Sequence, residues 1–277
     1  MRKLLLTYIF ILTTSTICAQ SIGIGYYDLD RLYDTIPSRF YDDSHFTPEG
    51  KYHWNTERYN QKVSHSAALL DSMRLPIIGL YGIENEAVVR DIVARCQQDY
   101  SYIHRTRNSL DGMDFALLYF GDQLYIDRVE ALRNMLVVEA MIASSDSPIT
   151  IILTLSGEDT YIYIGRNRRI EDTFVVILGS LYQNHISKLG FSNIMERRER
   201  RGEGNMNSER GWIMRDRAAT NQSQRVTNCG VYITPWLLTR DMQSPLPTFD
   251  RYSYVGGYSR YLPIFIYCTD SSQPKDL

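Results

Sequence analysis

The 277-residue sequence predicts a mixed-sheet α/β or α+β domain in which helices cover stacked sheets. Apolar runs alternate with helix-patterned segments over the first third of the chain, and short apolar runs then follow one another. The run PIIGLYGI at 76–83 is apolar without interruption, which is typical of a strand covered on both faces. These two observations favour a sheet protein with helices outside the sheets.

The first part of the chain is predicted to form strand, helix, strand and helix. Residues 22–27 read as a strand, and 76–83 follow as the second one. Between them, residues 57–72 repeat apolar side chains at helical spacing, namely Tyr59, Val63, Ala67 and Leu70. Asn85 is placed to cap a second helix. The inner face of that helix is expected to carry Val89, Ile92, Val93 and Cys96.

The rest of the chain is predicted to be mostly strands. We expect them at 115–119, 149–155, 160–164, 174–178, 231–234 and 263–268. The run ERRERRGEGNMNSERGWIMRDR at 196–217 is dense in charge of both signs and in glycine. Such a run usually forms a solvated face, so we predict an exposed excursion there.

The composition is that of a soluble globular protein, with 44% hydrophobic and 22% charged residues. A formal charge of −2 gives no electrostatic reason to expect a nucleic acid or an anionic membrane as partner. The 21 tyrosines are compatible with a surface that faces carbohydrate or protein, although tyrosine-rich core strands are the more common explanation.

The N-terminus has the three parts of a secretory signal peptide. Arg2 and Lys3 precede an apolar stretch at 4–12, and small or polar residues lead to Ala19. We expect cleavage after Ala19, a signal peptide at 1–19, a single domain at 20–277 and a secreted or periplasmic protein. The apolar stretch is too short to span a bilayer comfortably, so no transmembrane segment is expected after cleavage. Cys18 as the lipid site of a lipoprotein is disfavoured, because the residues before it match that pattern poorly.

Three cysteines remain after cleavage, namely Cys96, Cys229 and Cys268. Because three is odd, at least one stays free or pairs between chains. The sequence allows a Cys229–Cys268 disulfide in an oxidising compartment, and Cys96 is expected to be a small buried apolar residue. No CxxC or zinc-ligand spacing is present.

Six segments in order resemble the endonuclease/exonuclease/phosphatase family, which has the DNase I-like fold, and especially its secreted bacterial branch. They read GYYDLDRLYDT, HFTPEGKYHWNTERYNQKV, PIIGLYGIENEAVVRDIV, IHRTRNSLDGMDFALLY, VVILGSLY and GGYSRYLPIFIY. The resemblance runs from about residue 22 to the end of the chain. It implies a four-layer sandwich, with two mixed sheets face to face and helices outside. It also implies hydrolysis of phosphate esters with a divalent metal, usually magnesium.

The resemblance places the family's metal ligands on the first two predicted strands. Its asparagine corresponds to Asp28, and the acid two residues on to Asp30, so these two keep oxygen ligands. Its metal-binding glutamate falls on Gly82, which has no side-chain ligand. Glu84, expected on the same face of the strand, stands in only partly. The catalytic histidine and the helix after it are expected to be deleted near 165–169.

The family's remaining catalytic groups fall on degenerate positions. Its G-D-F-N segment becomes GSLY, with Ser180 and Tyr182 in place of the acid and the amide. Its S-D-H triplet becomes SRY, so Arg260 and Tyr261 replace the last aspartate and histidine. The acid that orients this histidine maps to Asp216 or to Cys229, and the sequence does not decide between them.

The leading hypothesis is therefore a secreted pseudoenzyme that needs no cofactor and acts as a binding or scaffold domain. Each lost interaction is typically worth on the order of 10²–10⁴ in rate. The alternative is a weak metal-dependent phosphodiesterase, nuclease or phosphatase that holds Mg or Mn on Asp28, Asp30 and Glu84. In that case Asp114 adds a carboxylate, and His104 sits in a loop that flanks the cleft.

The expected partner is a protein or an anionic ligand outside the cytoplasm. Arg166, Arg168, Arg169 and Arg260 are predicted to crowd the former cleft and to make it cationic. A cationic cleft could hold a phosphate, a glycan acid or the carboxylates of a partner protein.

Overall fold

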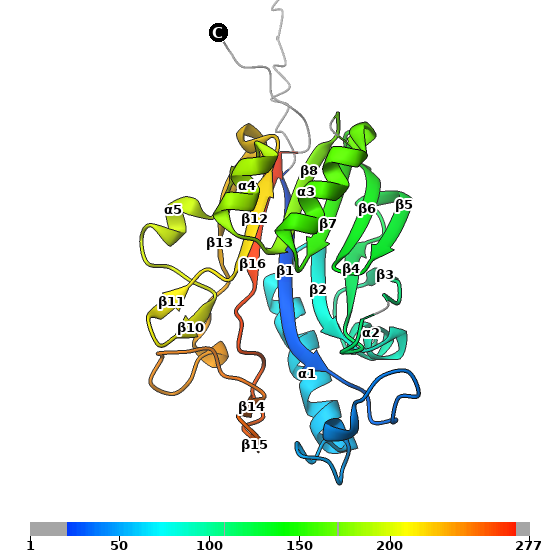
Figure 1. Cartoon of the computed structure of the whole chain (residues 1–277), viewed down its shortest axis with the longest axis vertical. Helices are drawn as coiled ribbons and strands as arrows, with labels where there is room; N and C mark the ends of the chain where they lie inside the picture. The colour runs from blue at the N-terminus through cyan, green and yellow to red at the C-terminus, as the bar shows by residue number, and fades with distance from the viewer. Residues whose placement is uncertain (1–20, 108, 171, 270–277) are drawn as a thin grey trace, which may run out of the picture.

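The computed structural model describes residues 21–107, 109–170 and 172–269. The predicted signal peptide, its cleavage site and Cys18 lie outside the described residues. Within them, two six-stranded sheets form the body of the molecule, with helices alongside (Figure 1). No helix of the described part is long and apolar enough to cross a membrane.

The first sheet is mixed and has the strand order β13-β16-β1-β2-β4-β3. Its strands are β1 (Ser21–Leu32), β2 (Ile77–Ile83), β3 (Tyr100–His104), β4 (Asp114–Phe120), β13 (Val226–Val231) and β16 (Ile264–Thr269). β1 runs parallel to β2 and antiparallel to β16.

The second sheet is also mixed, in the order β5-β6-β7-β8-β12-β9. Its strands are β5 (Leu124–Leu132), β6 (Met135–Ile142), β7 (Ser147–Thr154), β8 (Phe174–Ser180), β9 (Ser192–Asn193) and β12 (Asp216–Thr220). β7 and β8 are parallel. Two small hairpins are formed by β10 (Met206–Ser208) with β11 (Gly211–Ile213), and by β14 (Phe249–Asp250) with β15 (Ser253–Tyr254).

The longer helices are α1 (Thr56–Met73), α2 (Glu86–Val93), α3 (Gly157–Arg166) and α4 (Gln183–Leu189). Shorter turns are α5 (Glu196–Glu199), η1 (Ser44–Phe46), η2 (Arg168–Ile170), η3 (Ser223–Arg225) and η4 (Pro235–Leu237). Asn85 caps α2 as predicted, since its side-chain oxygen accepts from the amide of Val88 at 3.2 Å.

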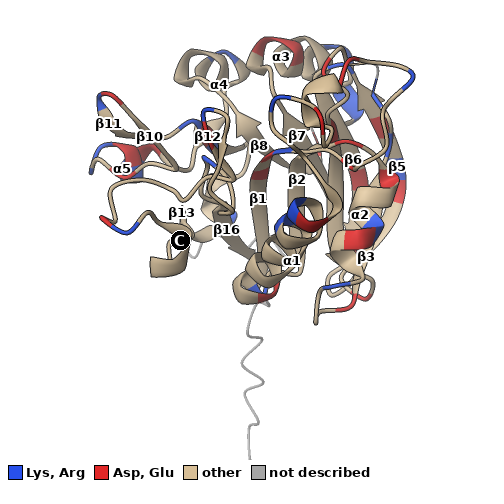
Figure 2. Ribbon diagram, turned by 90° about the horizontal axis from the view of Figure 1, so that it is seen from below, with Lys and Arg blue, Asp and Glu red and all other residues tan. Residues whose placement is uncertain are grey.

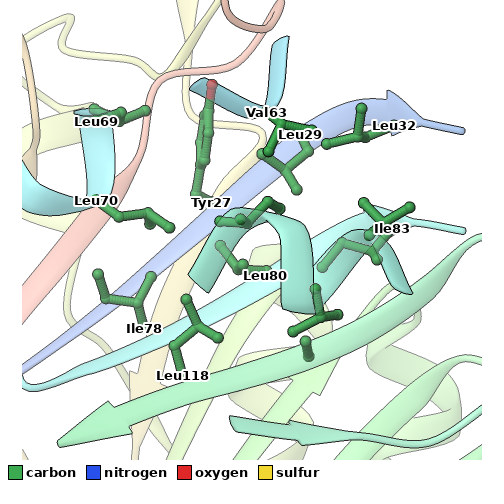
Figure 3. Close-up of a cluster of buried hydrophobic side chains, with 14 of the residues drawn as sticks. Tyr27, Leu29, Leu32, Val63, Leu69, Leu70, Ile78, Leu80, Ile83 and Leu118 are labelled. Atoms are coloured by element: carbon green, nitrogen blue, oxygen red, sulfur yellow. The ribbon is translucent and has the colours of Figure 1, made fainter. Parts of the chain in front are cut away.

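Three apolar clusters separate four layers. Between the sheets, Ile24 and Tyr26 of β1 belong to the same cluster as Leu153 of β7. On the outer face of the first sheet, Tyr27 and Leu29 contribute to a cluster shared with α1 and α2, as Figure 3 shows for β1, β2 and α1. A third cluster joins the outer face of the second sheet to α3 and α4. The predicted four-layer sandwich is confirmed.

The strand predicted at 160–164 is wrong, because these residues lie in α3. Ser156 caps this helix by accepting from the amide of Asp159 at 3.2 Å, and two acids occupy the first turn. These end signals favour a helix, and they outweigh the strand preference of the tyrosines and isoleucines in TYIYI. The helix that the sequence suggested was deleted is therefore present as α3.

Two further predictions are corrected in the second half of the chain. The strand expected at 231–234 ends at Val231, and η4 begins at Pro235. The run at 196–217 is not simply an exposed excursion, since it folds into α5, β10, β11 and the start of β12. Its residues Asn205, Met214 and Asp216 are buried.

The three cysteines of the described part are free. Cys229 lies opposite Ile266, and Cys268 lies opposite Val226, so the pairing register keeps the two cysteines apart. The Cys229–Cys268 disulfide that the sequence allows is therefore not formed. Cys96 is half-buried beyond the end of α2, and burial raises the pKa of its thiol to about 12.

Candidate functional site

Strand alternation brings two aspartates to the rim between the sheets. The β1 side chains Ile24 and Tyr26 point into the gap between the sheets, and Asp28 continues this face at the end of the gap. On β12, Asp216 shares its face with Ala218, which belongs to the same inter-sheet cluster. The exposed fractions of Asp28 and Asp216 are only 3% and 1%.

Arg215 joins these two carboxylates. Its Nη1 donates to Oδ2 of Asp28 and to Oδ1 of Asp216, both at 2.8 Å. Asn205 fixes the backbone that carries this arginine, because its Oδ1 accepts from the amides of Arg215 at 2.8 Å and of Asp216 at 3.1 Å. The Asn205 amide nitrogen also donates to Oδ2 of Asp216 at 2.7 Å.

The SRY segment forms the other side of the site. Arg260 makes a bidentate ion pair with Asp30, through Nε to Oδ2 at 2.8 Å and Nη2 to Oδ1 at 2.6 Å. The hydroxyl of Ser259 donates to the carbonyl of Asp28 at 2.7 Å. The guanidinium carbon of Arg215 lies 4.1 Å from the centre of the Tyr261 ring. We call Asp28, Asp30 and Asp216 the carboxylate cluster.

Burial and mutual repulsion govern the protonation of this cluster. Burial raises the pKa of Asp28 to about 7, and Asp216 and Asp30 push it in the same direction against Arg215. Burial also raises the pKa of Asp216. The hydrogen bonds that Arg260 donates to Asp30 raise the pKa of Arg260. Arg215 likewise stays charged, because Asp216 and Asp28 raise its pKa although burial acts to lower it.

Gly82 occupies a bulge rather than a regular strand position. The register of β2 against β4 shifts between Tyr81 and Ile83, and Gly82 has φ of +83°. A Cβ there would lie 3.1 Å from the amide nitrogen of Arg31 and 3.3 Å from Oδ1 of Asp28. The position therefore favours glycine both for its backbone and for its lack of a side chain.

Restoring a glutamate at this position is expected to damage the fold. The Gly82→Glu variant should lose about 1–3 kcal/mol in the free energy of unfolding, because it forces a side chain into a positive-φ bulge beside a buried carboxylate. Urea denaturation measures this loss. The matched control is Gly165→Glu on α3, where a Cβ has no atom within 4 Å, and its stability should not fall. Equal stability of Gly82→Glu and the wild type would contradict the account of the bulge.

Glu84 does not join the carboxylate cluster. Its Oε2 accepts from the amide of Asp34 at 2.5 Å, and its Oε1 accepts from the hydroxyl of Tyr41 at 2.6 Å. Burial raises its pKa to about 7, with Asp34 and Asp43 as the acidic neighbours that add to the effect. The bulge at Gly82 breaks the alternation on which the same-face prediction depended. The structure thus brings Asp28 and Asp30 together with Asp216, and it places Glu84 elsewhere.

His104 and Asp114 form a separate buried pair in the first sheet. His104 is the last residue of β3 and not a loop residue as predicted, and its Nε2 lies 3.1 Å from Oδ2 of Asp114. Oδ1 of Asp114 accepts from the amide of Arg107 at 2.9 Å. Asp114 therefore accepts a hydrogen bond from a loop amide and orients His104 within the first sheet.

Of the other predicted positions, Ser180 and Tyr182 lie beside the site, whereas Arg166 and Arg169 lie apart from it. Ser180 ends β8 opposite Asp216 and lines a hollow with Arg215 and Tyr261, which Tyr182 also borders. Arg169 pairs with Glu130 and Glu139 on the β5–β6 hairpin. Arg166 lines a different hollow beside that hairpin. The prediction that Arg166, Arg168 and Arg169 crowd the cleft is therefore wrong for Arg166 and Arg169, whereas Arg260 does lie in it.

The site does not present the ligand set of a divalent cation. Within the described ranges no three His, Cys, Asp or Glu side chains are arranged to hold a metal ion. The Asp28 and Asp30 carboxylates that such an ion would need already accept hydrogen bonds from guanidinium groups. A hard cation requires several free oxygen ligands around one point. Figure 2 shows acidic and basic positions interspersed over this side of the molecule.

Three residues of the site were not predicted from the sequence, although two of them carried usable signals. One of the two alignments placed Asp216 at the position of the acid that orients the family's histidine, and Arg215 is the residue before Asp216. Lys62 is the last residue of the WNTERYNQK segment quoted for the resemblance. Its Nζ donates to the carbonyls of Asp30 at 3.1 Å and Arg31 at 3.0 Å. Asn205 lay in the run predicted to be exposed, and no pattern marked it.

Two mixed sheets packed face to face with helices outside them are the architecture of the DNase I-like fold. The chain belongs to the endonuclease/exonuclease/phosphatase family, whose model matches residues 23–165. No curated protein matches the sequence.

Solved structures share the fold at low sequence identity. Humanized D. rerio TDP2 is 11% identical over 89% of this chain and 98% of its own, with a TM-score of 0.57. The Bacteroides thetaiotaomicron mannosyl-6-phosphatase is 11% identical over 88% and 98%, with a TM-score of 0.56. An endonuclease/exonuclease/phosphatase family protein of the same organism is 10% identical over 90% and 97%, with a TM-score of 0.57.

Proposed function

We propose that this chain binds a ligand in the family's cleft without hydrolysing it, because its own guanidinium groups hold the place of the metal ion. One observation carries the proposal. A single nitrogen of Arg215 donates to carboxylates from both sheets, Asp28 on β1 and Asp216 on β12. Arg260 neutralises the third acid, Asp30, through a bidentate ion pair.

A guanidinium group neutralises carboxylates but cannot perform the chemistry of a metal ion. It has no open coordination position, so it cannot coordinate a water oxygen and lower the pKa of that water as a metal ion does. The residues at the positions of the family's water-orienting acid, its amide and its last histidine are Ser180, Tyr182 and Tyr261 in this chain. None of these three side chains is a carboxylate or an imidazole.

The alternative function, a weak metal-dependent phosphoesterase, needs a rearrangement of the site. Asp28 and Asp30 would have to leave Arg215 and Arg260, and Glu84 would have to leave Tyr41 and the Asp34 amide. The similar folds include a mannosyl-6-phosphatase and TDP2, but a shared fold does not determine activity. The binding role is proposed for a secreted or periplasmic protein.

An assay for phosphate ester hydrolysis tests the proposal directly. The mature protein, residues 20–277, is incubated with bis-p-nitrophenyl phosphate, p-nitrophenyl phosphate or DNA in magnesium, manganese or calcium. We expect turnover equal to that of buffer. The Asp30→Ala and Glu84→Ala variants are the controls for trace contamination. Turnover by the wild type that both substitutions abolish would overturn the proposal and establish the metal-dependent alternative.

A further inference from the structure

A hollow of about 490 Å³ lies beside the Asp30–Arg260 pair, between the segment around η1 and the β14–β15 hairpin. Both segments lie at the lower end of the molecule in Figure 1. Its wall contains the rings of Phe46, Tyr52, Phe249 and Tyr252. We call this the aromatic hollow. Its volume is within the range of about 300–1,000 Å³ that small-molecule sites occupy.

The rings of the aromatic hollow form one continuous surface. Phe46 stacks on Tyr52 with ring centres 4.4 Å apart, and Tyr52 contacts Phe249 at 4.8 Å and Tyr252 at 5.6 Å. Tyr252 remains 52% exposed. Such a surface offers aromatic ring faces and edges next to phenolic hydroxyls, which suits a ligand that has both an apolar face and hydroxyl groups.

Cationic groups lie on the same hollow without carboxylate partners. Arg31 and Arg251 line it together with Arg260. The guanidinium carbon of Arg31 is 5.4 Å from the Phe46 ring centre and 5.9 Å from that of Tyr52. Among residues 21–107, 109–170 and 172–269, neither Arg31 nor Arg251 has an ion-pair partner, in contrast to Arg260. Two guanidinium groups therefore remain available for a ligand's acidic group.

The backbone that presents Arg31 is strained and held in place. Asp30 and Arg31 both adopt left-handed conformations, with φ of 51° and 64°. Such residues cost on the order of 1–3 kcal/mol each and persist where the surroundings impose them. Here Lys62 imposes them, since its Nζ donates to both carbonyls from a side chain that is 1% exposed. These two hydrogen bonds fix the direction of the backbone segment that borders the hollow.

We infer that the aromatic hollow binds a sugar that carries an acidic group, either a carboxylate or a phosphate. The ring face packs on the aromatic surface, and Arg31 and Arg251 pair with the acidic group. The Asp250 carboxylate, which lies next to Arg251, accepts hydrogen bonds from neighbouring hydroxyl groups of the sugar. This inference rests on the proposed binding function, and it adds the chemical class of the ligand and the hollow in which the ligand binds.

Isothermal titration calorimetry of the mature protein tests the inference with glucuronate, glucose 6-phosphate, glucose, inorganic phosphate and AMP. We expect at least one acidic sugar to bind more tightly than glucose, phosphate and AMP. Comparison of glucuronate with glucose 6-phosphate identifies the acidic group. Arg31→Gln should weaken acidic-sugar binding about tenfold, and Tyr252→Ala should weaken it several-fold.

Two matched substitutions control for unspecific effects. Arg166→Gln removes an exposed arginine of α3, and Tyr125→Ala removes a 61% exposed tyrosine of β5, both outside the aromatic hollow. Both variants should bind like the wild type.

Three results would overturn the inference: no acidic sugar bound at 10 mM, phosphate or AMP bound as tightly as the sugars, or binding unchanged in Arg31→Gln and Tyr252→Ala. None of these results would bear on the loss of hydrolysis. Conversely, phosphate release from glucose 6-phosphate would overturn the proposed function and leave the site in place.

Discussion

Replacement of Arg215 by methionine lowers the free energy of unfolding by about 3–5 kcal/mol at pH 8, which is the cost of leaving buried charges without their partner. Arg215 is the bridge between Asp28 and Asp216, and both acids are almost completely buried. Without the guanidinium group, two carboxyls face each other across the rim of the two sheets. Urea denaturation followed by circular dichroism measures the change.

A second substitution shows whether the loss comes from charge. Asp28→Asn in the Arg215→Met background removes one of the two acids and should recover part of the lost stability. The destabilisation by Arg215→Met should also shrink at pH 5, which lies below the raised pKa of Asp28. The control Arg200→Met removes an exposed arginine that pairs with Glu196 on α5, and it should change stability by less than about 0.5 kcal/mol. A loss for Arg215→Met that does not depend on pH or on Asp28 would contradict the electrostatic bridge.

The early elements could be predicted from the sequence because local and tertiary signals agree there. The helix expected at 57–72 spans Thr56–Met73, and Asn85 caps the next helix. The strand expected at 76–83 is β2. In these segments the apolar spacing, the capping residues and the eventual burial all favour the same structure.

The second half of the chain was harder because these signals conflict. TYIYI has the side chains of a strand but follows the start signal Ser156 with Glu158 and Asp159 in the first helical turn. The strand β5 lies at the edge of its sheet and has many exposed polar side chains, so it lacks the apolar run that marks an inner strand. Because α3 was predicted as a strand, the histidine segment was expected after it, near 165–169. By position this segment follows β7, at 154–156, and it contains no histidine.

For the candidate site, the sequence predicted which catalytic groups are missing, but not how the remaining side chains are arranged. The sequence indicates that Gly82, Arg260 and Tyr261 stand where the resemblance expects catalytic groups. It does not tell which side chains pair with the acids that remain. Arg260 reaches Asp30 across 230 residues, and Arg215 reaches Asp28 across 187 residues. No local spacing encodes such pairs, because they depend on the register of two sheets and on their packing.

The pH dependence of stability provides the second large effect. Between pH 4 and pH 8, Asp28 is expected to lower the free energy of unfolding by on the order of 4 kcal/mol, since its pKa rises from 3.8 to about 7 on folding. A carboxyl with a raised folded pKa binds its proton more tightly in the folded state. Its contribution is therefore most favourable below the unfolded pKa, and it is lost as the pH rises through the folded value. Glu84, whose pKa is raised from 4.5 to about 7, acts in the same direction.

The comparison of wild type with Asp28→Asn isolates this contribution from the other acids. The variant keeps a side-chain oxygen that can accept from the Asp30 amide, and it leaves Arg215 with Asp216 as a single pair. Its stability should fall less steeply with pH, so that it equals or exceeds that of the wild type at pH 8. Asp127→Asn on the exposed face of β5 is the control, and its profile should run parallel to the wild type. If Asp28→Asn also ran parallel, Asp28 would be ionised throughout this range, and the idea that burial keeps this carboxyl protonated up to about pH 7 would have to be abandoned.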